Sequence, residues 1–383
     1  MSGRADPQRI ALFMSTSGHS GVDRAVRHLV PALAGRGYKV DLLKVRRHGP
    51  VIENPPEGVR VIDTGVSTTY AALPALIRYL RRERPAVLLA DKDKVNRTAL
   101  LARWLAGARK TTRLVLSSGT TISIDLQHRG AFERWLQRTS MGRLYGFADQ
   151  VIVTCEAVAD DMSSYTGLDR KHIKAVASPV IPGSLLQARP AAPDHPWFQS
   201  TSEPGAVPVI LGVGELGPRK DFPTLIRAFA QLREQRPVRL AIAGKGGQLG
   251  ALRALAAELG VTDDVAFLGY RSDVYALMAH ASVFAMTSRW EGLGFVLIEA
   301  LASGTPVVAC DCPSGPSEVL DGGRHGELVP VGDASALASA IRETLDAPRS
   351  AEQCREAARR YEIESATNEY LDAFGLAHHV QKP

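Results

Sequence analysis

Residues 288–320 read SRWEGLGFVLIEALASGTPVVACDCPSGPSEVL and contain the most regular pattern in the chain. The residues just before them, 282–286, form a short apolar run that is typical of a buried strand. A loop with two glycines follows, then an apolar helical run at 296–303 and a second strand-like run at 306–309. Strand, loop, helix and strand in this order predict one unit of a parallel sheet that is covered by helices.

The same alternation extends along the chain in both directions. In the first half, apolar runs predict strands at 9–16, 39–45, 59–63, 86–90, 113–117, 150–154 and 173–177, and helices at 22–35, 71–84 and 96–106. In the second half they predict further strands at 209–213, 238–243 and 265–268, and further helices at 223–234, 249–259, 335–346 and 351–374. The predicted fold class is α/β, with two Rossmann-like domains that face each other across a cleft.

A change in composition separates the two halves. Residues 180–208 are rich in proline and small residues and have no sustained period, which is typical of an interdomain connection. We therefore place the first domain at residues 1–182, a linker at 183–207, the second domain at 208–350 and a C-terminal helical segment at 351–383. A length of 383 residues agrees with two domains of ordinary size.

The composition is that of a globular protein without a membrane-spanning segment. Hydrophobic residues make up 45% of the chain and charged residues 22%, and no apolar run reaches the roughly 18 residues that a membrane helix needs. The first apolar run, 10–14, is too short for the core of a signal peptide. The four cysteines include no CxxC pair and are too few for a disulfide framework. We therefore expect a cytoplasmic protein.

Charge is distributed unevenly. Residues 1–185 hold 28 Lys and Arg against 16 Asp and Glu, whereas the remaining residues hold 18 against 24. A basic half indicates an anionic partner, with a membrane surface, a phosphorylated acceptor and a nucleic acid as candidates, or else an ordinary solvated surface rich in arginine. We favour peripheral contact with an anionic inner-membrane surface through residues 78–84 and 109–113, and we expect no nucleic-acid partner.

Two glutamates in the 288–320 stretch are candidate ligands for hydroxyl groups. Glu291 lies in the glycine-containing loop, where the backbone can approach a ligand closely. The following helix begins near Phe295, so the N–H groups of Gly294, Phe295 and Val296 lie at an anion-binding helix N-terminus. Glu299 follows one to two turns later, and carboxylates accept hydrogen bonds from ribose and sugar hydroxyls. The alternative is that both glutamates are ordinary loop and helix residues.

A basic pair follows the first strand of the second domain. Gly212, Gly214 and Gly217 have the spacing of a dinucleotide-binding loop, but an acidic residue is lacking at the expected strand tip. Arg219 and Lys220 come next, just before a predicted helix. Adjacent cations at such a loop can neutralise the two phosphates of a leaving nucleoside diphosphate. We prefer this interpretation to an exposed basic loop.

Weaker candidates lie after other predicted strands: Gly244, Tyr270 and Arg271 in the second domain, and Gly18, His19 and Gly21 in the first. The second-domain residues are candidates for the nucleotide pocket or belong to ordinary turns. The first-domain residues are candidates for an acceptor or phosphate loop at a helix N-terminus, although a lone loop histidine is more often plain surface.

A metal site is not expected. Asp91 and Asp93 flank Lys92 in a DxD pattern, and Lys92 and Lys94 oppose a dedicated cation site. Cys310 and Cys312 have no further ligands close in sequence and are expected to be packing residues.

These motifs resemble those of the retaining glycosyltransferases of family four, which have the GT-B fold. Glu291 and Glu299 match the E-x7-E motif of that family, and Arg219 and Lys220 match its basic pair. The stretch SGTPVVACDCPSGPSEVL is similar to one that is common in bacterial polysaccharide and glycolipid transferases. The resemblance is specific over residues 207–345, and over residues 1–180 it rests on the architecture and on the glycine loop at 18–24.

The resemblance implies a retaining, metal-independent sugar transfer from a nucleotide-sugar donor, with UDP as the favoured carrier, to a lipid-linked or saccharide acceptor in bacterial glycan synthesis. It implies that Glu299 binds ribose, that Arg219 and Lys220 bind the diphosphate, and that Glu291 with the backbone of residues 294–296 binds the donor sugar. It also implies that the first domain binds the acceptor and that the last helix crosses back to it. No cofactor is implied. Many members have a histidine or charged residue where this chain has Ser118, Gly119 and Thr120.

Four other functions fit part of the pattern. A GDP-sugar-dependent transferase differs only in the base. A nucleotide-sugar epimerase or phosphorylase shares the donor site, and an epimerase needs further carboxylates and a histidine. An NAD-dependent oxidoreductase rests on the glycine spacing alone. A non-catalytic nucleotide-sugar-binding scaffold is opposed by the complete set of Arg219, Lys220, Glu291 and Glu299.

Overall fold

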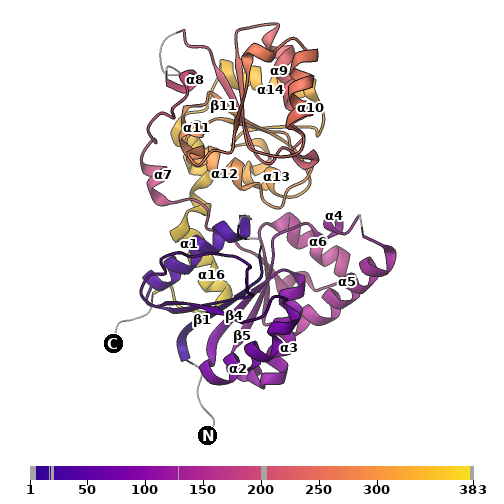
Figure 1. Cartoon of the computed structure of the whole chain (residues 1–383), viewed down its shortest axis with the longest axis vertical. Coiled ribbons are helices and arrows are strands. Elements are labelled where there is room, and N and C mark those ends of the chain that lie inside the picture. Colours follow the sequence, from indigo (N-terminus) through magenta and orange to yellow (C-terminus); the bar gives the residue numbers. More distant parts are fainter. Residues whose placement is uncertain (1–5, 17, 19–20, 128, 200–204, 380–383) are drawn as a thin grey trace. The chain divides into compact units, whose positions relative to one another are not determined.

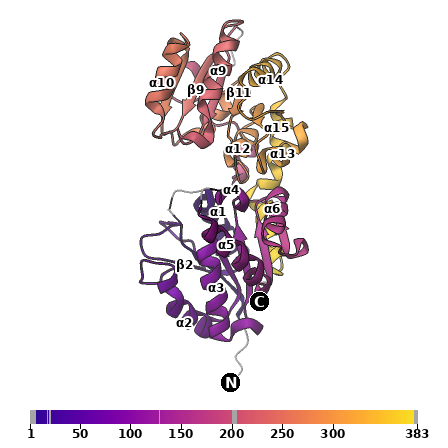
Figure 2. The same ribbon diagram turned by 90° about the vertical axis from the view of Figure 1, so that its right-hand side faces the viewer.

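The computed structural model describes residues 6–16, 18, 21–127, 129–199 and 205–379, and it divides into two compact units. The first unit contains the residues up to Val180 together with those from Ile363 onward, and the second contains Ile181–Glu362. Each unit is a parallel sheet with helices packed on it, as Figures 1 and 2 show from two directions. This confirms the predicted α/β class with two Rossmann-like units.

The first unit has seven parallel strands in the order β3-β2-β1-β4-β5-β6-β7. The strands are β1 (Asp6–Met14), β2 (Lys39–Lys44), β3 (Val59–Asp63), β4 (Pro85–Asp91), β5 (Arg113–Ser118), β6 (Gln150–Val153) and β7 (Ile173–Ala175). The helices are α1 (Gly21–Gly35), α2 (Leu73–Glu83), α3 (Asp93–Ala106), α4 (Ile122–Asp125), α5 (Ala131–Leu144), α6 (Glu156–Thr166) and α16 (Ile363–Phe374).

Strand β1 shows why this sheet lies between two layers of helices. Ile10, Leu12 and Met14 alternate along β1 and share one core cluster with Leu29 of α1 and Phe374 of α16. The residues between them are also buried, so both faces of the strand are covered. Apolar side chains on both faces are typical of a central parallel strand.

The second unit has six strands in the order β10-β9-β8-β11-β12-β13. They are β8 (Val209–Val213), β9 (Arg239–Ala243), β10 (Val265–Gly269), β11 (Val283–Met286), β12 (Val307–Cys310) and β13 (Glu327–Val329). The helices are α7 (Gly183–Gln187), α8 (Pro196–Gln199), α9 (Phe222–Arg233), α10 (Leu249–Glu258), α11 (Val274–His280), α12 (Phe295–Ala302), α13 (Gly315–Val319), α14 (Ala334–Asp346) and α15 (Ala351–Ala358).

Helix α9 shows how the helices attach to the second sheet. Phe222, Leu225, Ile226 and Phe229 recur at helical spacing and are all buried in one cluster, which also contains Ile341 of α14. Side chains three and four residues apart lie on one face of a helix, so this face covers the sheet. This packing fixes the position of α9 on the sheet. The helix begins at Phe222, and one residue separates it from the basic pair at 219–220.

The C-terminal segment differs from the prediction of one helix over 351–374. Helix α15 begins at a capping box formed by Ser350 and Gln353 and packs against α12 in the second unit. The chain then becomes extended at Glu362, because the N–H of Ile181 donates to the carbonyl of Tyr361 at 3.1 Å. Helix α16 begins at Ile363 and packs against α1 in the first unit. The residues from 351 to 362 therefore belong with the second sheet.

Several helices had no clear signal in the sequence. The 14-residue helix α5 is an example, because Met141 is its one buried residue, whereas Phe132 and Trp135 are exposed. A helix without a buried apolar stripe does not show the usual periodicity. Across the described ranges, no helix has both the length and the apolar character that crossing a bilayer requires.

Candidate functional site

The candidate site lies at the carboxyl edge of the second sheet. Strand β8 lies between β9 and β11, and all three run in parallel, so the loops that follow them emerge at the same edge. The loop after β8 contains a single 3-10 turn, Pro218–Lys220, directly before α9. The loop after β11 contains Glu291 and ends at α12. These two loops therefore meet at the point where ligands of such sheets bind.

Glu291 is the centre of the contacts between the two loops. Its Oε2 accepts from Arg219 Nη1 at 2.7 Å, and its Oε1 accepts from Lys220 Nζ at 2.6 Å. Ser288 Oγ also donates to Oε1, at 2.7 Å. Lys220, Ser288 and Glu291 are buried, whereas the Arg219 side chain is 38% exposed. The structure thus brings together the three residues that the sequence analysis singled out, Arg219, Lys220 and Glu291, and adds Ser288 to them.

The charges around Glu291 lower the pKa of its carboxyl. Burial by itself raises this pKa, but the charges of Lys220 and Arg219, with hydrogen bonds from Lys220 and Ser288, outweigh burial. The net result is a carboxylate that stays ionised at neutral pH. Both cations therefore lie against a fixed negative charge rather than against solvent alone.

Further hydrogen bonds join the two loops next to this cluster. Thr287 Oγ1 donates to the carbonyl of Lys220 at 2.8 Å, and the N–H of Arg289 donates to the carbonyl of Arg219 at 2.8 Å. Arg289 also pairs with Asp221 at 3.0 Å. Because these bonds hold the backbone on both sides of the ion pairs, the cations keep their place without help from a ligand.

Gly214 and Gly244 make room for these contacts. A Cβ at Gly214 would lie 2.9 Å from Lys220 Cε, and a Cβ at Gly244 would lie 1.8 Å from the carbonyl oxygen of Gly214. The N–H of Gly214 in turn donates to the carbonyl of Ala243 at 3.0 Å. The two glycines are required for close packing of the loops after β8 and β9, and this packing seats the Lys220 side chain.

Helix α12 directs its first turn at the same edge. Gly294 precedes the helix with φ of 81°, a left-handed conformation that favours glycine, and the N–H groups of Phe295 and Val296 lie in the first turn. A Cβ at Gly315 would lie 2.2 Å from the carbonyl oxygen of Leu293, so the loop before α12 packs tightly against α13. The helix N-terminus is consequently held in a fixed position.

The other predicted donor residues have different surroundings. Glu299 lies within α12 and is fully buried. Tyr270 is 73% exposed, with Lys245 Nζ 5.8 Å from its ring centroid, so the loops after β9 and β10 are neighbours. Arg271 makes two hydrogen bonds to Asp273, at 2.8 and 2.6 Å, and this pairing raises the pKa of Arg271. Arg271 is therefore already occupied by a neighbouring carboxylate.

In the first unit, Gly18 of the glycine loop lies close to Gly49, because a Cβ at Gly49 would lie 2.4 Å from Gly18 Cα. Gly18 has φ of 90°, Gly21 begins α1, and His19 lies outside the described residues. Asp23 of α1 is fully buried and accepts a hydrogen bond from Thr16 Oγ1. The loop and the start of α1 are thus tied together by polar contacts inside this unit.

The DxD pattern spans the last residue of β4, Asp91, and the first residue of α3, Asp93, and its two carboxylates have different surroundings. Asp93 pairs with Arg97 at 2.7 Å, whereas Asp91 is buried, which raises the pKa of its carboxyl to about 6. Cys310 and Cys312 are buried thiols, and burial raises the pKa of both. Among the described residues, no group of three or more His, Cys, Asp or Glu side chains could hold a metal ion.

Ser288, Thr287, Asp221 and Arg289 were not singled out by the sequence analysis. Ser288 precedes Glu291 by three residues, a spacing at which a hydroxyl in a tight loop can reach the carboxylate. The contacts of Thr287 and Asp221 depend on the meeting of two loops far apart in sequence, for which a single sequence has no signal.

Two family models of glycosyltransferases together match most of the chain. A family model described as "Glycosyl transferases group 1" matches residues 194–361, and one described as "Glycosyl transferase 4-like domain" matches residues 20–179. The chain is 29% identical over 330 residues to the lipopolysaccharide core biosynthesis glycosyltransferase LpsE of Rhizobium meliloti, covering 85% of each chain. It is 32% identical over 228 residues to a GDP-mannose-dependent phosphatidylinositol monomannoside mannosyltransferase of Mycolicibacterium smegmatis, covering 54% of this chain and 59% of that one.

Solved structures share the fold of the whole chain. HepE of Anabaena in complex with UDP superposes with a TM-score of 0.77 at 19% identity, over 96% of this chain and 99% of HepE. The apo form of the lipopolysaccharide outer core galactosyltransferase WaaB superposes with a TM-score of 0.75 at 16% identity, over the same shares of the two chains. At these identities the likeness concerns the fold.

Proposed function

This chain is a glycosyltransferase with the GT-B fold, and we propose that it transfers a sugar from a nucleotide-sugar donor without a metal cofactor and with retention of the anomeric configuration. The observation that carries the proposal is the cluster of Arg219, Lys220 and Glu291 at the carboxyl edge of the second sheet. Two cations held at one point suit the two phosphates of a nucleoside diphosphate.

The diphosphate is proposed to bind at Arg219 and Lys220. As the bond between sugar and phosphate breaks, negative charge grows on the leaving diphosphate, and cations that are already in place stabilise it without reorganisation. Lys220 is buried and its ammonium is paired with Glu291, so the ammonium is already in position before the donor binds. These protein charges supply the charge stabilisation that a divalent cation supplies in other transferases.

Glu291 and Glu299 are proposed to bind hydroxyl groups of the donor. Glu291 lies in the loop before α12 and remains ionised, so it accepts hydrogen bonds from sugar hydroxyls. Glu299 is assigned to the ribose, and the N–H groups of Gly294, Phe295 and Val296 are assigned to the sugar or phosphate at the N-terminus of α12. Gly214, Gly244, Tyr270 and Arg271 complete the proposed nucleotide pocket.

UDP is the proposed carrier and a glycan or lipid-linked saccharide is the proposed acceptor. HepE, which shares the fold, was solved with UDP, and LpsE is named for lipopolysaccharide core synthesis. GDP is the competing carrier, because the Mycolicibacterium relative is named as GDP-mannose-dependent. The first unit, with its loop at Gly18, His19 and Gly21, is assigned to the acceptor.

Thermal unfolding with UDP, GDP, ADP and NAD tests the donor site. A ligand that binds only the folded protein raises the midpoint, and we expect the largest rise with UDP in the wild type and a much smaller one in Glu299→Ala. Glu343→Ala, which removes an exposed glutamate from α14, is the matched control and should respond like the wild type. A rise with NAD alone, or equal responses of the two variants, would contradict the assignment. If the reaction needs no metal, transfer should persist in EDTA. If it retains configuration, NMR should show the donor's anomeric configuration in the product.

A further inference from the structure

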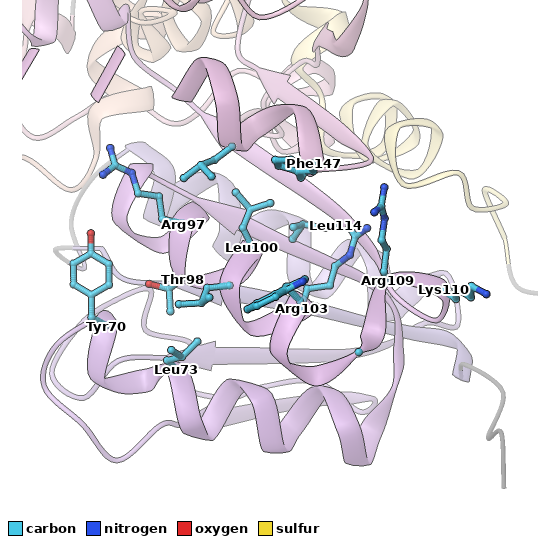
Figure 3. A pocket seen from close by; sticks show the side chains of 14 residues that line it. Tyr70, Leu73, Arg97, Thr98, Leu100, Arg103, Arg109, Lys110, Leu114 and Phe147 are labelled. Atoms are coloured by element: carbon cyan, nitrogen blue, oxygen red, sulfur yellow. The ribbon is translucent and has the colours of Figure 1, made fainter. Parts of the chain in front are cut away.

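A large apolar hollow lies on the outer side of α3 in the first unit, on the surface of that unit itself. It has a volume of about 1070 Å³ and is lined by side chains of α3, of residues 107–110 and of the segment 144–147 (Figure 3). Its apolar lining includes Tyr70, Leu100, Leu101, Trp104, Leu144 and Phe147. We call this surface the α3 hollow.

The aromatic side chains of the α3 hollow are unusually exposed. Trp104 is 75% exposed, Phe147 60% and Tyr70 56%. Helix α3 has a second apolar side, which contains Val95 and Ala99 and is buried against the sheet. The helix therefore carries more apolar surface than the fold of the unit needs, and a cluster of large exposed apolar side chains marks an interaction surface.

Cations surround this apolar surface. Arg109 and Lys110 line the hollow and are exposed, and neither forms an ion pair with any described residue. Arg78, Arg81 and Arg82 lie on α2, which packs beside α3, and Arg81 donates to the carbonyl of Leu105 of α3 at 2.8 Å. The nearby carboxylates are taken up: Asp93 pairs with Arg97, Asp149 pairs with Arg103, and Glu83 pairs with Arg82 of α2. The surface therefore presents positive charge around an apolar centre.

We propose that the α3 hollow docks on the headgroup region of an anionic phospholipid bilayer, with Trp104 and Phe147 inserted at the boundary of headgroups and acyl chains. Tryptophan and tyrosine favour that boundary because one end of the ring is apolar and the other is polar. Arginine and lysine around them bind the anionic headgroups. Apolar and cationic side chains occur together in the hollow and on the neighbouring α2.

A second copy of the chain fits this surface less well. In a two-fold symmetric contact the same patch lies on both sides of the interface. Arg109, Lys110, Arg78 and Arg81 would then face their own copies with no free carboxylate among the described residues of the hollow to compensate them. A bilayer with anionic lipids supplies the opposite charge and an apolar layer together. The inference stands whether or not the proposed transfer reaction is correct.

Co-sedimentation of the full chain with vesicles tests the proposal. At low salt we expect binding to phosphatidylcholine vesicles that contain phosphatidylglycerol, little binding to phosphatidylcholine alone, and loss of binding at high salt. Trp104→Ser combined with Phe147→Ser should weaken binding roughly tenfold or more, because two apolar side chains no longer enter the interface. Arg109→Gln combined with Lys110→Gln should weaken it by roughly tenfold or more as well.

Two double variants in the second unit are the matched controls. Leu259→Ser with Val331→Ser removes exposed apolar side chains, and Arg253→Gln with Arg324→Gln removes exposed cations, so both should bind vesicles like the wild type. Equal losses in the control and hollow variants would overturn the assignment of the docking surface. Failure of the wild type to bind anionic vesicles would also overturn it. So would light scattering that shows a dimer for the wild type and a monomer for the Trp104→Ser, Phe147→Ser variant. Melting curves verify that the variants are folded, which their exposed positions favour.

Discussion

Replacing Glu291 by glutamine is expected to destabilise the second unit and at the same time to strengthen its binding of UDP. The substitution keeps the shape of the side chain but removes the charge that holds Lys220 Nζ at 2.6 Å and Arg219 Nη1 at 2.7 Å. Removing one partner of a buried ion pair costs about 3–5 kcal/mol. Because water screens the 38% exposed Arg219, we expect the lower end of that range, about 3 kcal/mol.

The gain in UDP affinity follows from the same geometry. A phosphate oxygen that binds Lys220 Nζ lies about 5 Å from the Glu291 carboxylate, since each hydrogen bond spans about 2.7 Å. Like charges at about 5 Å repel each other by about 3 kcal/mol at an effective dielectric constant of about 20, and by about 1 kcal/mol in a well-solvated loop. Removing the carboxylate should therefore tighten UDP binding by roughly fivefold to a hundredfold.

Turnover should move in the opposite direction. Glu291 is proposed to bind the donor sugar, so Glu291→Gln should lower kcat with the nucleotide sugar although UDP binds more tightly. Calorimetric titration with UDP, denaturant unfolding and steady-state transfer assays measure the three quantities on one preparation. Glu343→Gln on the surface of α14 is the control. Unchanged stability together with unchanged or weaker UDP binding would refute the reasoning, because both effects derive from the same two ion pairs.

The pH dependence of stability provides an independent check on the same residue. The pKa of Glu291 is lowered in the folded protein, since the charges of Lys220 and Arg219 outweigh its burial. A group with a lowered folded pKa contributes stability above its unfolded pKa of 4.5, and that contribution is lost as pH falls toward the folded value. The wild type should thus lose more stability than Glu291→Gln on acidification below pH of about 4.5.

Three further substitutions test two features of the second unit and one of the first. Ser288→Ala removes a buried hydroxyl that donates to Glu291, so it should cost about 1.5–3 kcal/mol in denaturant unfolding and leave a smaller UDP-induced rise in Tm; a neutral result would mean that Ser288 does not hold the carboxylate. Gly244→Ala places a Cβ 1.8 Å from the carbonyl oxygen of Gly214, so it should destabilise the second unit by about 1–3 kcal/mol and weaken UDP binding, whereas Gly247→Ala, which meets nothing within 4 Å, should do neither. Asp91→Asn should stabilise the protein at pH 7 by up to about 3 kcal/mol, because burial raises the pKa of Asp91 to about 6 and the folded carboxyl then keeps its proton to a higher pH than the unfolded one. Wild-type stability should accordingly fall as pH rises from about 4 to about 6, and the same slope in Asp91→Asn would show that another group causes it.

The two parallel sheets, and the edge of the second sheet at which the candidate loops lie, were accessible to sequence reasoning because they follow from local patterns. Apolar runs of strand length, separated by helical runs, define two parallel sheets, and parallel strands bring their carboxyl ends to one edge. That rule places Arg219, Lys220 and Glu291 at the same edge of the sheet, and the adjacency of β8 and β11, which the structure shows, brings their loops together. It does not reveal that Glu291 forms ion pairs with both cations, because this depends on the conformation of each loop.

The differences from the sequence analysis arise from long-range contacts. The break between α15 and α16 depends on a hydrogen bond from Ile181 to Tyr361, which are 180 residues apart, whereas the local sequence favours a continuous helix. The exposure of Trp104 and Phe147 could not be predicted either, since large apolar residues at helical spacing ordinarily indicate a buried face. The charge in that region was visible in the sequence, but its apolar centre was not.

The resting arrangement of the site has a consequence for how a donor enters. Lys220 is seated by Gly214 and Gly244 and held by Glu291, so the cation is fixed before any ligand arrives. In the function proposed here, an incoming diphosphate would share Lys220 and Arg219 with Glu291 and would gain less binding energy than from free cations. Before the donor binds, the Glu291 carboxylate allows the two cations to lie close together in a buried loop. Once the phosphates pair with these cations, the carboxylate would be able to accept hydrogen bonds from the sugar hydroxyls. We therefore propose that part of the donor's binding energy is given up so that the charges of the site match the transition state, in which the diphosphate carries the most charge.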